Sequence, residues 1–464
     1  MQRDVFASIS PLDHRYYASS QQLFDQLSEY LSENAFIRYQ ARVEEALAKI
    51  LARKGLCSEQ VAQEISRAAR NIVPEEVYKE ERITRHNIRA LVNTIQAHVS
   101  DAARPFVHFT ATSVDIMDTA RAVQYRDVSE KMIIPQLKEL LGLFIAITRR
   151  EADAVQIGRT HGQHAVPITF GFAMAEYVSR LGNRIQLIIN TSRTLRGKMA
   201  GAVGAYNASS LFFPDPEEFE REVLAELGLK PATHSTQIVE PEYLTDWAHA
   251  LVSTLGVLAN FGDDVRHLQR TEIGEVGEAF EAGQVGSSTM PHKRNPWNFE
   301  HVKSIWKAFA PHMLTLYMDQ ISEHQRDLTN SASSRFVPEI ASALVAVTHR
   351  LNRVCSKLVI DRSRMMENLN MQKAFIIAEP LYILLAYNGH PDAHEAIRRL
   401  TLVAERTGKT LVDLVAESEE LAPYLARMTG YQRQVLERPE TYIGIASRKA
   451  LQVADYWEAA LLKQ

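Results

Sequence analysis

Five long segments with a helical repeat of apolar residues constrain the fold of this chain most strongly. Over residues 116–150, apolar side chains recur every three or four positions, which predicts a helix about 50 Å long at 1.5 Å per residue. Similar segments cover 167–198, 241–270 and 296–326, each opening on a proline, which the first turn of a helix tolerates. A fifth covers 334–358. Since a single helix cannot bury such a stripe, we predict a long-helix bundle completed by other copies of the chain.

Shorter helical patterns lie on both sides of this bundle. The first stretch ends at a break at Arg104 and Pro105, and the last contains turns at 388–391 and 407–408. Pro311 is expected to kink the segment that contains it. Because no convincing run of alternating apolar and polar residues indicates strands, we predict an all-α fold with three helical regions, 1–105, 106–358 and 359–464.

Composition narrows the class of partner. The 464 residues include 52 basic and 56 acidic ones, spread evenly for a net charge of -4, so no basic stripe indicates nucleic acid. The apolar run at 140–147 is too short to cross a membrane, and the first nine residues lack the apolar core of a signal or transit peptide. Two cysteines, Cys57 and Cys355, fit a reducing compartment. We expect a cytoplasmic protein with no membrane or nucleic-acid partner.

Residues 283–296, GQVGSSTMPHKRNP, form the most informative stretch. Gly283 and Gly286 permit backbone conformations closed to other residues, and Pro296 is a good first residue for a helix. Serines in such a segment are usually only polar loop residues. Two adjacent serines next to Lys293 and Asn295 instead favour a loop that closes over a ligand.

Two polar stations precede long helices. At the first, Thr112, Ser113 and Asp115 are preferred helix caps, and the same helix end attracts an anion such as a ligand carboxylate. At the second, RTHGQ, His161 and His164 lack a third metal ligand at a recognisable spacing. Because imidazole titrates near neutral pH, a general acid or base fits this station better.

Two further stations combine cations with polar groups. The sequence TRHN at 84–87 is either a helix start capped by Thr84 or a binding site. In QRDLTNSASSR at 325–335, Asp327 could pair with an arginine on a solvated helix end. Two arginines with serine and threonine hydroxyls also suit a phosphate group, so both interpretations stay open.

The motif GSSTMPHKRNP resembles the signature of the fumarase and aspartase superfamily, whose members release fumarate from a succinyl group. TATSVDIMDTA and RTHGQHAVP resemble its other two blocks, in the same order. Within the superfamily the chain is most similar to the adenylosuccinate lyases, by the motifs SPLDHRY, TRHN, GAVGAYNAS, STQIVEP, QRDLTNS and AEP. The resemblance covers nearly the whole chain and is strongest over 84–340.

The resemblance implies roles for residues at these stations. Ser287 is expected to be the general base and His161 the general acid, with Glu300 orienting this histidine. The expected substrate-binding residues are Arg15, Tyr16, Arg85, His86, Asn87, Thr112, Ser113, Thr160, Gln237, Lys293, Asn295, Arg326, Ser331 and Arg335.

Among these, Lys293, Asn295, Thr112 and Ser113 would hold the succinyl carboxylates. Arg15, Tyr16, Arg326, Ser331 and Arg335 would contact a nucleotide phosphate. Asn87 replaces an aspartate common in the family, and an amide stabilises a neighbouring imidazolium less well than a carboxylate does.

The implied activity is the release of fumarate from adenylosuccinate to give AMP, and from the succinyl-carboxamide imidazole ribotide to give its carboxamide. No metal or redox cofactor is expected, because electrons only rearrange during the elimination. The resemblance also implies a homotetramer with active sites shared between chains. Another superfamily lyase, such as argininosuccinate lyase, and a non-catalytic helical assembly protein are the alternatives.

Overall fold

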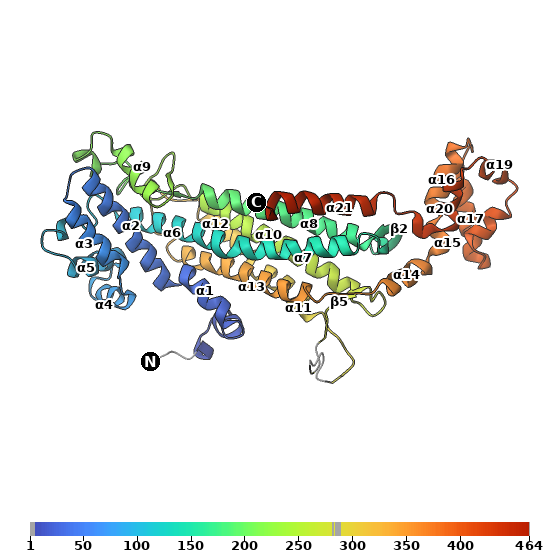
Figure 1. Ribbon diagram of the computed structural model, residues 1–464, viewed down its shortest axis with the longest axis horizontal. Coiled ribbons are helices and arrows are strands. Elements are labelled where there is room, and N and C mark those ends of the chain that lie inside the picture. Colours follow the sequence, from blue (N-terminus) through green and yellow to red (C-terminus); the bar gives the residue numbers. More distant parts are fainter. Residues whose placement is uncertain (1–4, 281–282, 284–288, 464) are drawn as a thin grey trace. The chain divides into compact units, whose positions relative to one another are not determined.

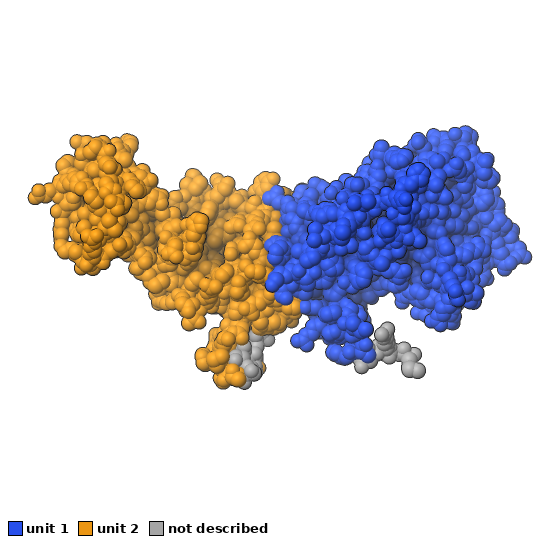
Figure 2. All heavy atoms as spheres, turned by 180° about the vertical axis from the view of Figure 1, so that it is seen from behind, with its two compact units in different colours: residues 1–137, 183–256, 304–349 blue, residues 138–182, 257–303, 350–464 orange. Residues whose placement is uncertain are grey.

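A computed structural model describes residues 5–280, 283 and 289–463. The chain divides into two compact units (Figure 2). Unit 1 contains residues 1–137, 183–256 and 304–349, and unit 2 contains residues 138–182, 257–303 and 350–464. Helices dominate both units (Figure 1), which confirms the predicted helical class. The division falls inside α7, α8, α10, α11 and α13, and the three predicted regions remain a proposal.

Unit 1 begins with a group of short amphipathic helices. Ser32 and Ser58 cap two of them by accepting hydrogen bonds from Ala35 N at 3.1 Å and Val61 N at 3.2 Å. Their apolar stripes bury a common core that includes Leu47, which is fully buried. The helices are α1 (Gln21–Leu31), α2 (Glu33–Arg53), α3 (Glu59–Arg70), α4 (Pro74–Thr84), α5 (Asn87–Ala97) and α9 (Pro216–Glu226).

The long helix predicted over 116–150 is present, with one irregular turn. α6 (Ser113–Val128) continues through a π-helical turn (Ser129–Ile133) into α7 (Ile134–Arg150). At that turn Ser129 Oγ donates to Tyr125 O at 2.7 Å and accepts from Trp247 Nε1 at 2.9 Å. A side-chain hydroxyl thus takes part in the backbone pattern where the helix widens.

The predicted helix start at Pro167 is wrong. Residues before it form β1 (Val155–Thr160) and β2 (Gln163–Thr169), an antiparallel pair, and α8 runs over Phe170–Thr194. Pro167 is tolerated because each strand of a two-stranded sheet has a free edge. Two shorter pairs complete the strands of the described chain: β3 (Arg196–Gly197) with β4 (Lys230–Pro231), and β5 (Val276–Gly277) with β6 (Val359–Ile360).

The other long segments follow their prolines. α10 (Glu242–Leu268) starts directly after Pro241, as predicted. The segment after Pro296 divides into α11 (Trp297–Phe309) and α12 (His312–Met318), separated at the predicted break at Pro311. The predicted end at Arg326 is wrong because helical structure stops at Met318. α13 (Val337–Cys355) follows a 3-10 turn.

The C-terminal part of unit 2 contains short helices around an apolar cluster. Leu381, Leu385 and Leu411 are fully buried in this cluster. Gly389 and Gly408 have φ values of 92° and 74°, which confirms the two predicted turns and suits glycine. The helices that contribute to this cluster are α16 (Ala378–Tyr387), α17 (Ala393–Thr407), α18 (Leu411–Ala416), α19 (Ala422–Leu425) and α20 (Gly430–Glu437). Before them, α14 (Arg362–Met371) and α15 (Lys373–Ile376) contribute Leu369 and Ile376 to a second cluster with Ile157 of β1.

The last helix, α21 (Ala446–Trp457), packs on the unit 2 portions of α7 and α8 (Figure 1). A Cβ at Gly182 would lie 2.3 Å from the Trp457 ring, so only glycine fits beneath this indole. Arg149 donates to Asp455 at 2.6 Å and to Glu458 at 2.9 Å. In the described part of the chain, no helix is long and apolar enough to cross a membrane.

Candidate active site

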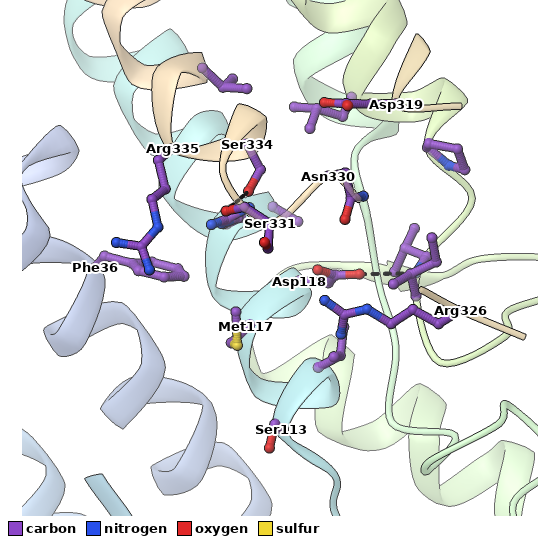
Figure 3. Close-up of a pocket in the computed structure, with 18 of the residues that line it drawn as sticks. Phe36, Ser113, Met117, Asp118, Asp319, Arg326, Asn330, Ser331, Ser334 and Arg335 are labelled. Carbon is purple, nitrogen blue, oxygen red and sulfur yellow. Dashed lines mark hydrogen bonds between the residues drawn. The ribbon is translucent and has the colours of Figure 1, made fainter. Parts of the chain in front are cut away.

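Unit 1 contains a cavity of about 460 Å³ that several predicted site residues line (Figure 3). Its walls come from the start of α2, the α4–α5 junction, α6 as far as Tyr125, residues 195–196, the segment 238–245 at the start of α10, and residues of the segment 316–337. These elements are far apart in the sequence, and the folding of unit 1 brings them together. The predicted residues on its wall are Arg85, His86, Asn87, Ser113, Arg326, Ser331 and Arg335.

The α4–α5 junction presents His86 in a defined orientation. Arg85 takes a left-handed conformation with φ of 53° and ends α4. His86, rather than the predicted Thr84, is the cap of α5, and its Nδ1 accepts from Arg89 N at 3.2 Å. Thr84 Oγ1 instead donates to Glu80 O at 3.1 Å. Because Nδ1 accepts, a neutral His86 carries its proton on Nε2 and has a donor available there.

Ser113 lies at the N-terminus of α6, where Asp115 fixes the backbone. Thr112 is the N-cap residue, and its amide donates to Asp115 Oδ2 at 2.8 Å. The buried Asp115 also accepts from Gly201 N at 3.2 Å and is paired with Lys198 Nζ. The capping prediction is confirmed for Asp115, which is occupied by these contacts. Ser113 faces the cavity at a helix end that attracts anions.

The loop leading into α6 is held in an unusual backbone conformation. His108 and Thr110 have φ values of 63° and 66°, which are costly for residues with a Cβ and most of all for β-branched ones. The buried Glu44 accepts from His108 N at 3.0 Å and contacts His108 Nδ1 at 2.7 Å. Burial alone would lower the pKa of His108, but the charge of Glu44 and its hydrogen bond raise it overall.

The candidate phosphate site lies after α12. Arg326 donates through Nε to Asp327 O at 3.0 Å and through Nη1 to Gln237 Oε1 at 3.4 Å. The Asp327 carboxylate accepts from Thr329 N at 2.9 Å and from Glu323 N at 2.9 Å. Its hydrogen bonds in the described chain therefore come from neighbouring loop residues and not from an arginine. The hydrogen bond from Arg326 places Gln237 beside the candidate phosphate site.

The charged residues on the cavity wall that the sequence did not indicate include Asp118, Arg121 and Arg196. Asp118 belongs to the second turn of α6, and Arg121 follows one turn later. Arg121 lies over the Phe36 ring at 5.1 Å, and Arg196 over the Tyr243 ring at 5.3 Å. The spacing of Ser113, Asp118 and Arg121 on one helix was an available signal, whereas no motif indicates Arg196.

His161 lies in unit 2, at the tip of the β1–β2 hairpin. His161 and Gly162 form the two-residue loop between the paired residues Thr160 and Gln163, with φ values of 54° and 75°. Positive φ at both central residues is the requirement of a type I′ turn, which matches the twist of the strands. Thr160 and His161 are exposed. The imidazole of His161 is therefore exposed at the tip of a short, regular hairpin.

A buried polar network holds the base of the hairpin. Arg159 Nη2 donates to Glu275 Oε1 at 2.6 Å, and the Glu275 side chain is 0% exposed. Gln156 Nε2 and Asn368 Nδ2 also donate to this carboxylate, at 2.6 Å and 2.7 Å. Several donors thus satisfy one buried charge, so the hairpin is anchored to α14 and to the segment before β5.

His164 does not share the environment of His161. Its Nδ1 is buried without a partner among the described residues, and burial lowers its pKa. The described residues contain no group of three or more His, Cys, Asp or Glu side chains that could hold a metal ion. His164 therefore belongs to the packing of the hairpin.

The remaining predicted residues of unit 2 lie around the start of α11. Lys293 and Glu300 are exposed, and Asn295 is partly buried. Glu278 fixes this helix start by accepting from Asn298 N at 2.8 Å. Within the described chain no hydrogen bond joins Glu300 to His161, so the orienting role of Glu300 stays a proposal. Ser287 and Gly286 lie outside the described residues.

Two family models match the chain. The lyase model covers residues 14–308, and the adenylosuccinate lyase C-terminal model covers residues 322–431. The adenylosuccinate lyase of Archaeoglobus fulgidus is 34% identical over 460 residues, which are 98% of this chain and 100% of that protein. The chain belongs to the adenylosuccinate lyase family of the fumarase and aspartase superfamily.

Other relatives support the family and show its breadth. The adenylosuccinate lyase of Pyrococcus horikoshii is 34% identical, with 97% of this chain and 98% of that protein covered. An N-acetyl-S-(2-succino)cysteine lyase of Enterococcus italicus is 27% identical, with 92% and 93% covered. The structure of a fumarate lyase from Mesorhizobium sp. BNC1 matches with a TM-score of 0.81 at 25% identity, over 93% of this chain and 97% of that one. The chain is thus a lyase of a superfamily whose members act on small molecules and are typically oligomeric.

The predicted site residues of this family member fall into two sets. Unit 1 contains the cavity set together with Thr112 and Gln237, and unit 2 contains Thr160, His161, Lys293, Asn295 and Glu300. Arg15 and Tyr16 belong to unit 1, in a π-helical turn (Leu12–Tyr17) before α1, and are not among the cavity-lining residues. Arg15 is exposed, and its predicted contact with the phosphate remains a proposal.

Proposed function

We propose that this protein cleaves adenylosuccinate into AMP and fumarate, and the succinyl-carboxamide imidazole ribotide into its carboxamide and fumarate. One observation carries the proposal: the unit 1 cavity combines Arg326, Ser331 and Arg335 with Ser113 at a helix N-terminus. The first group suits a phosphate and the second a carboxylate. Relatives of 34% identity over nearly the whole chain are named for the first of these reactions.

In the proposed mechanism Ser287 removes the proton from the carbon next to a succinyl carboxylate. Negative charge then develops on that carboxylate, where Lys293, Asn295 and the N-terminus of α6 with Thr112 and Ser113 stabilise it. The bond from carbon to nitrogen breaks, and the electron pair that leaves with the nitrogen takes a proton from His161. The proton balance is complete with one base and one acid. Glu300 would orient His161.

His86 is proposed as a second active-site histidine. Because its Nδ1 accepts from the α5 backbone, its Nε2 is the atom that faces a ligand as a donor. Asn87 Oδ1 accepts from Ile88 N at 2.8 Å and its Nδ2 donates to Met117 Sδ at 3.6 Å. Asn87 is therefore engaged locally, and His86 is assigned substrate binding rather than proton transfer.

The active form is proposed to be a homotetramer with shared sites in the cytoplasm. His161, Lys293 and Glu300 are exposed in the single chain, as groups completed by another chain would be. Both cysteines are free thiols, which suits a reducing compartment.

Fumarate release from purified protein tests the activity. We expect release with adenylosuccinate, and little or none with argininosuccinate or N-acetyl-S-(2-succino)cysteine, because neither carries a phosphate. Faster release with either of these two compounds would reject the proposal in favour of a sister lyase. No release with any compound would support a non-catalytic protein.

Substitution of the acid and the base tests their roles. Ser287→Ala and His161→Gln should each lower kcat at least about 100-fold, the usual contribution of such groups, with adenylosuccinate binding largely kept. His98→Gln, at an exposed histidine paired with Glu76 in unit 1, is the matched control and should keep normal turnover. Near-normal turnover of either site variant would refute that residue's role.

A further inference from the structure

Asp118 is a carboxylate on the wall of the unit 1 cavity that the mechanism does not use. It is partly buried, and its Oδ2 accepts from Val239 N at 3.0 Å. In the residues that the structure describes, no hydrogen bond reaches its other oxygen, Oδ1. An enclosed charged acceptor with an open position is costly unless a donor fills it.

The surroundings of Asp118 restrict which donor this is. Figure 3 shows Asp118 between Ser113 and Ser331, with Arg326 on the adjacent wall. Burial raises the pKa of Asp118 overall, although the Val239 amide and the charges of Arg121, Lys198 and Arg326 act in the opposite direction. A carboxylate repels a phosphate or a succinyl carboxylate, so the ligand group that faces it is a hydrogen-bond donor and not an anion.

The order of groups along the cavity identifies the donor, and this step rests on the proposed function. Asp118 lies five residues beyond Ser113 on α6, about 7.5 Å along the helix axis at 1.5 Å per residue. Ser113 is the proposed carboxylate end and Ser331 the proposed phosphate end. In a nucleotide the ribose connects the phosphate to the base. The ribose hydroxyls therefore face the wall between these two ends.

We propose that Asp118 is a specificity-determining residue that accepts a hydrogen bond from a ribose hydroxyl of the nucleotide substrate. The bond from an O–H to a carboxylate is short and strong. The same side chain holds the segment 235–239 through Val239, so that Gln237 stays beside Arg326. Asp118 would thus couple recognition of the ribose to the placement of the phosphate site.

Substrates that lack one hydroxyl test the proposal without any mutation. For the wild type, kcat/KM on either the 2′-deoxy or the 3′-deoxy form of adenylosuccinate should fall about 10- to 100-fold, as for other bonds to charged groups. If both deoxy substrates react as fast as adenylosuccinate, the proposal is overturned.

The variant Asp118→Asn then assigns the effect to this side chain. Asparagine keeps one oxygen for Val239 N and removes the second acceptor, so the penalty of the sensitive deoxy substrate should shrink to less than about threefold. Asp319→Asn is the matched control, because Asp319 also lines the cavity but accepts from Ser333 Oγ at 2.7 Å with one oxygen and 2.8 Å with the other. It should retain the wild-type penalty. An unchanged penalty in Asp118→Asn would assign Asp118 a purely structural role.

Failure of the proposed function would be visible separately. If the wild type releases no fumarate, calorimetry with AMP, 2′-deoxy AMP and 3′-deoxy AMP still measures the hydroxyl dependence. Weaker binding of one deoxy nucleotide by the wild type, lost in Asp118→Asn, supports the assignment. Equal binding of all three nucleotides by the wild type contradicts it.

Discussion

In unit 1 the proposed binding residues Ser113, Arg326 and Ser331 line a cavity built from several separate parts of one chain, whereas in unit 2 the proposed acid His161 and the proposed carboxylate ligand Lys293 are exposed. The binding residues are placed by capping, buried pairs and loop hydrogen bonds within their own unit. The β1–β2 hairpin that carries His161 is anchored by a buried polar network, while the His161 and Lys293 side chains are exposed. The exposure of His161 and Lys293 is what the proposal of shared sites expects, whereas the cavity of unit 1 is formed by residues of that unit alone.

The largest expected effect comes from mixing inactive variants. If sites are shared, Ser287→Ala and His161→Gln subunits that exchange should together regain activity at least about tenfold above either variant alone, because some sites then contain both intact groups. Turnover is measured after subunit exchange, which is followed with differently labelled chains. Exchange without recovered activity would place both groups of a site on one chain.

The next effect is expected from breaking the polar network of Glu275, which anchors the hairpin that carries His161. Glu275→Gln leaves the partly buried Arg159 without its charge partner and should cost up to about 3 kcal/mol in the free energy of unfolding. It should also lower turnover, since the hairpin carries His161. Urea unfolding measures the first and fumarate release the second.

The exposed pair of Arg180 and Glu176 is the matched control for this loss. Glu176→Gln should change the free energy of unfolding by less than about 1 kcal/mol. Equal losses for the two variants would show that the hairpin network does not anchor unit 2.

The stability that the His108–Glu44 pair contributes, in the loop before α6, should depend on pH. The pKa of His108 is raised in the folded protein by Glu44, so the stabilisation is complete below the ordinary pKa of about 6.5 and is lost as pH rises through the raised value. Each pKa unit corresponds to about 1.4 kcal/mol. Unfolding free energies measured from pH 6 to pH 9 should decline more for the wild type than for His108→Gln. Glu44→Gln should remove the same dependence, and its persistence there would rule out this pair as the source.

The smallest effect concerns strain at the cavity loop. Thr110 has φ of 66°, and its Oγ1 is buried without a hydrogen-bond partner in the described chain. Thr110→Gly should therefore raise the free energy of unfolding by up to about 1 kcal/mol, after the entropic cost of glycine is subtracted. Thermal unfolding checks this, and the neighbouring Ala111→Gly should be neutral or destabilising. If Thr110→Gly is less stable than the wild type, the contacts of the Thr110 side chain stabilise the fold by more than its strained backbone conformation costs.

Sequence patterns predicted the elements that local rules decide. Pro241 marked the start of α10, Pro311 marked a break, and Asp115 fixed the start of α6. The hairpin was missed because its turn uses His161 and Gly162 with positive φ, where asparagine and glycine are the usual signal. Asp118 was missed because its importance depends on Val239 and Arg326, which are distant in sequence and brought near by folding. The chemical character of single residues could therefore be predicted from the sequence, whereas the residues that surround them in the folded protein could not.

The contact between Gly182 and Trp457 has a consequence for biosynthesis. The ribosome releases α8 long before it makes α21, the helix that covers Gly182. At about 5–20 residues per second, residues around Gly182 wait on the order of tens of seconds for Trp457. Unit 2 therefore completes its packing only after α21 has left the ribosome, and a nascent chain stalled before α21 would leave this glycine face open to chaperones.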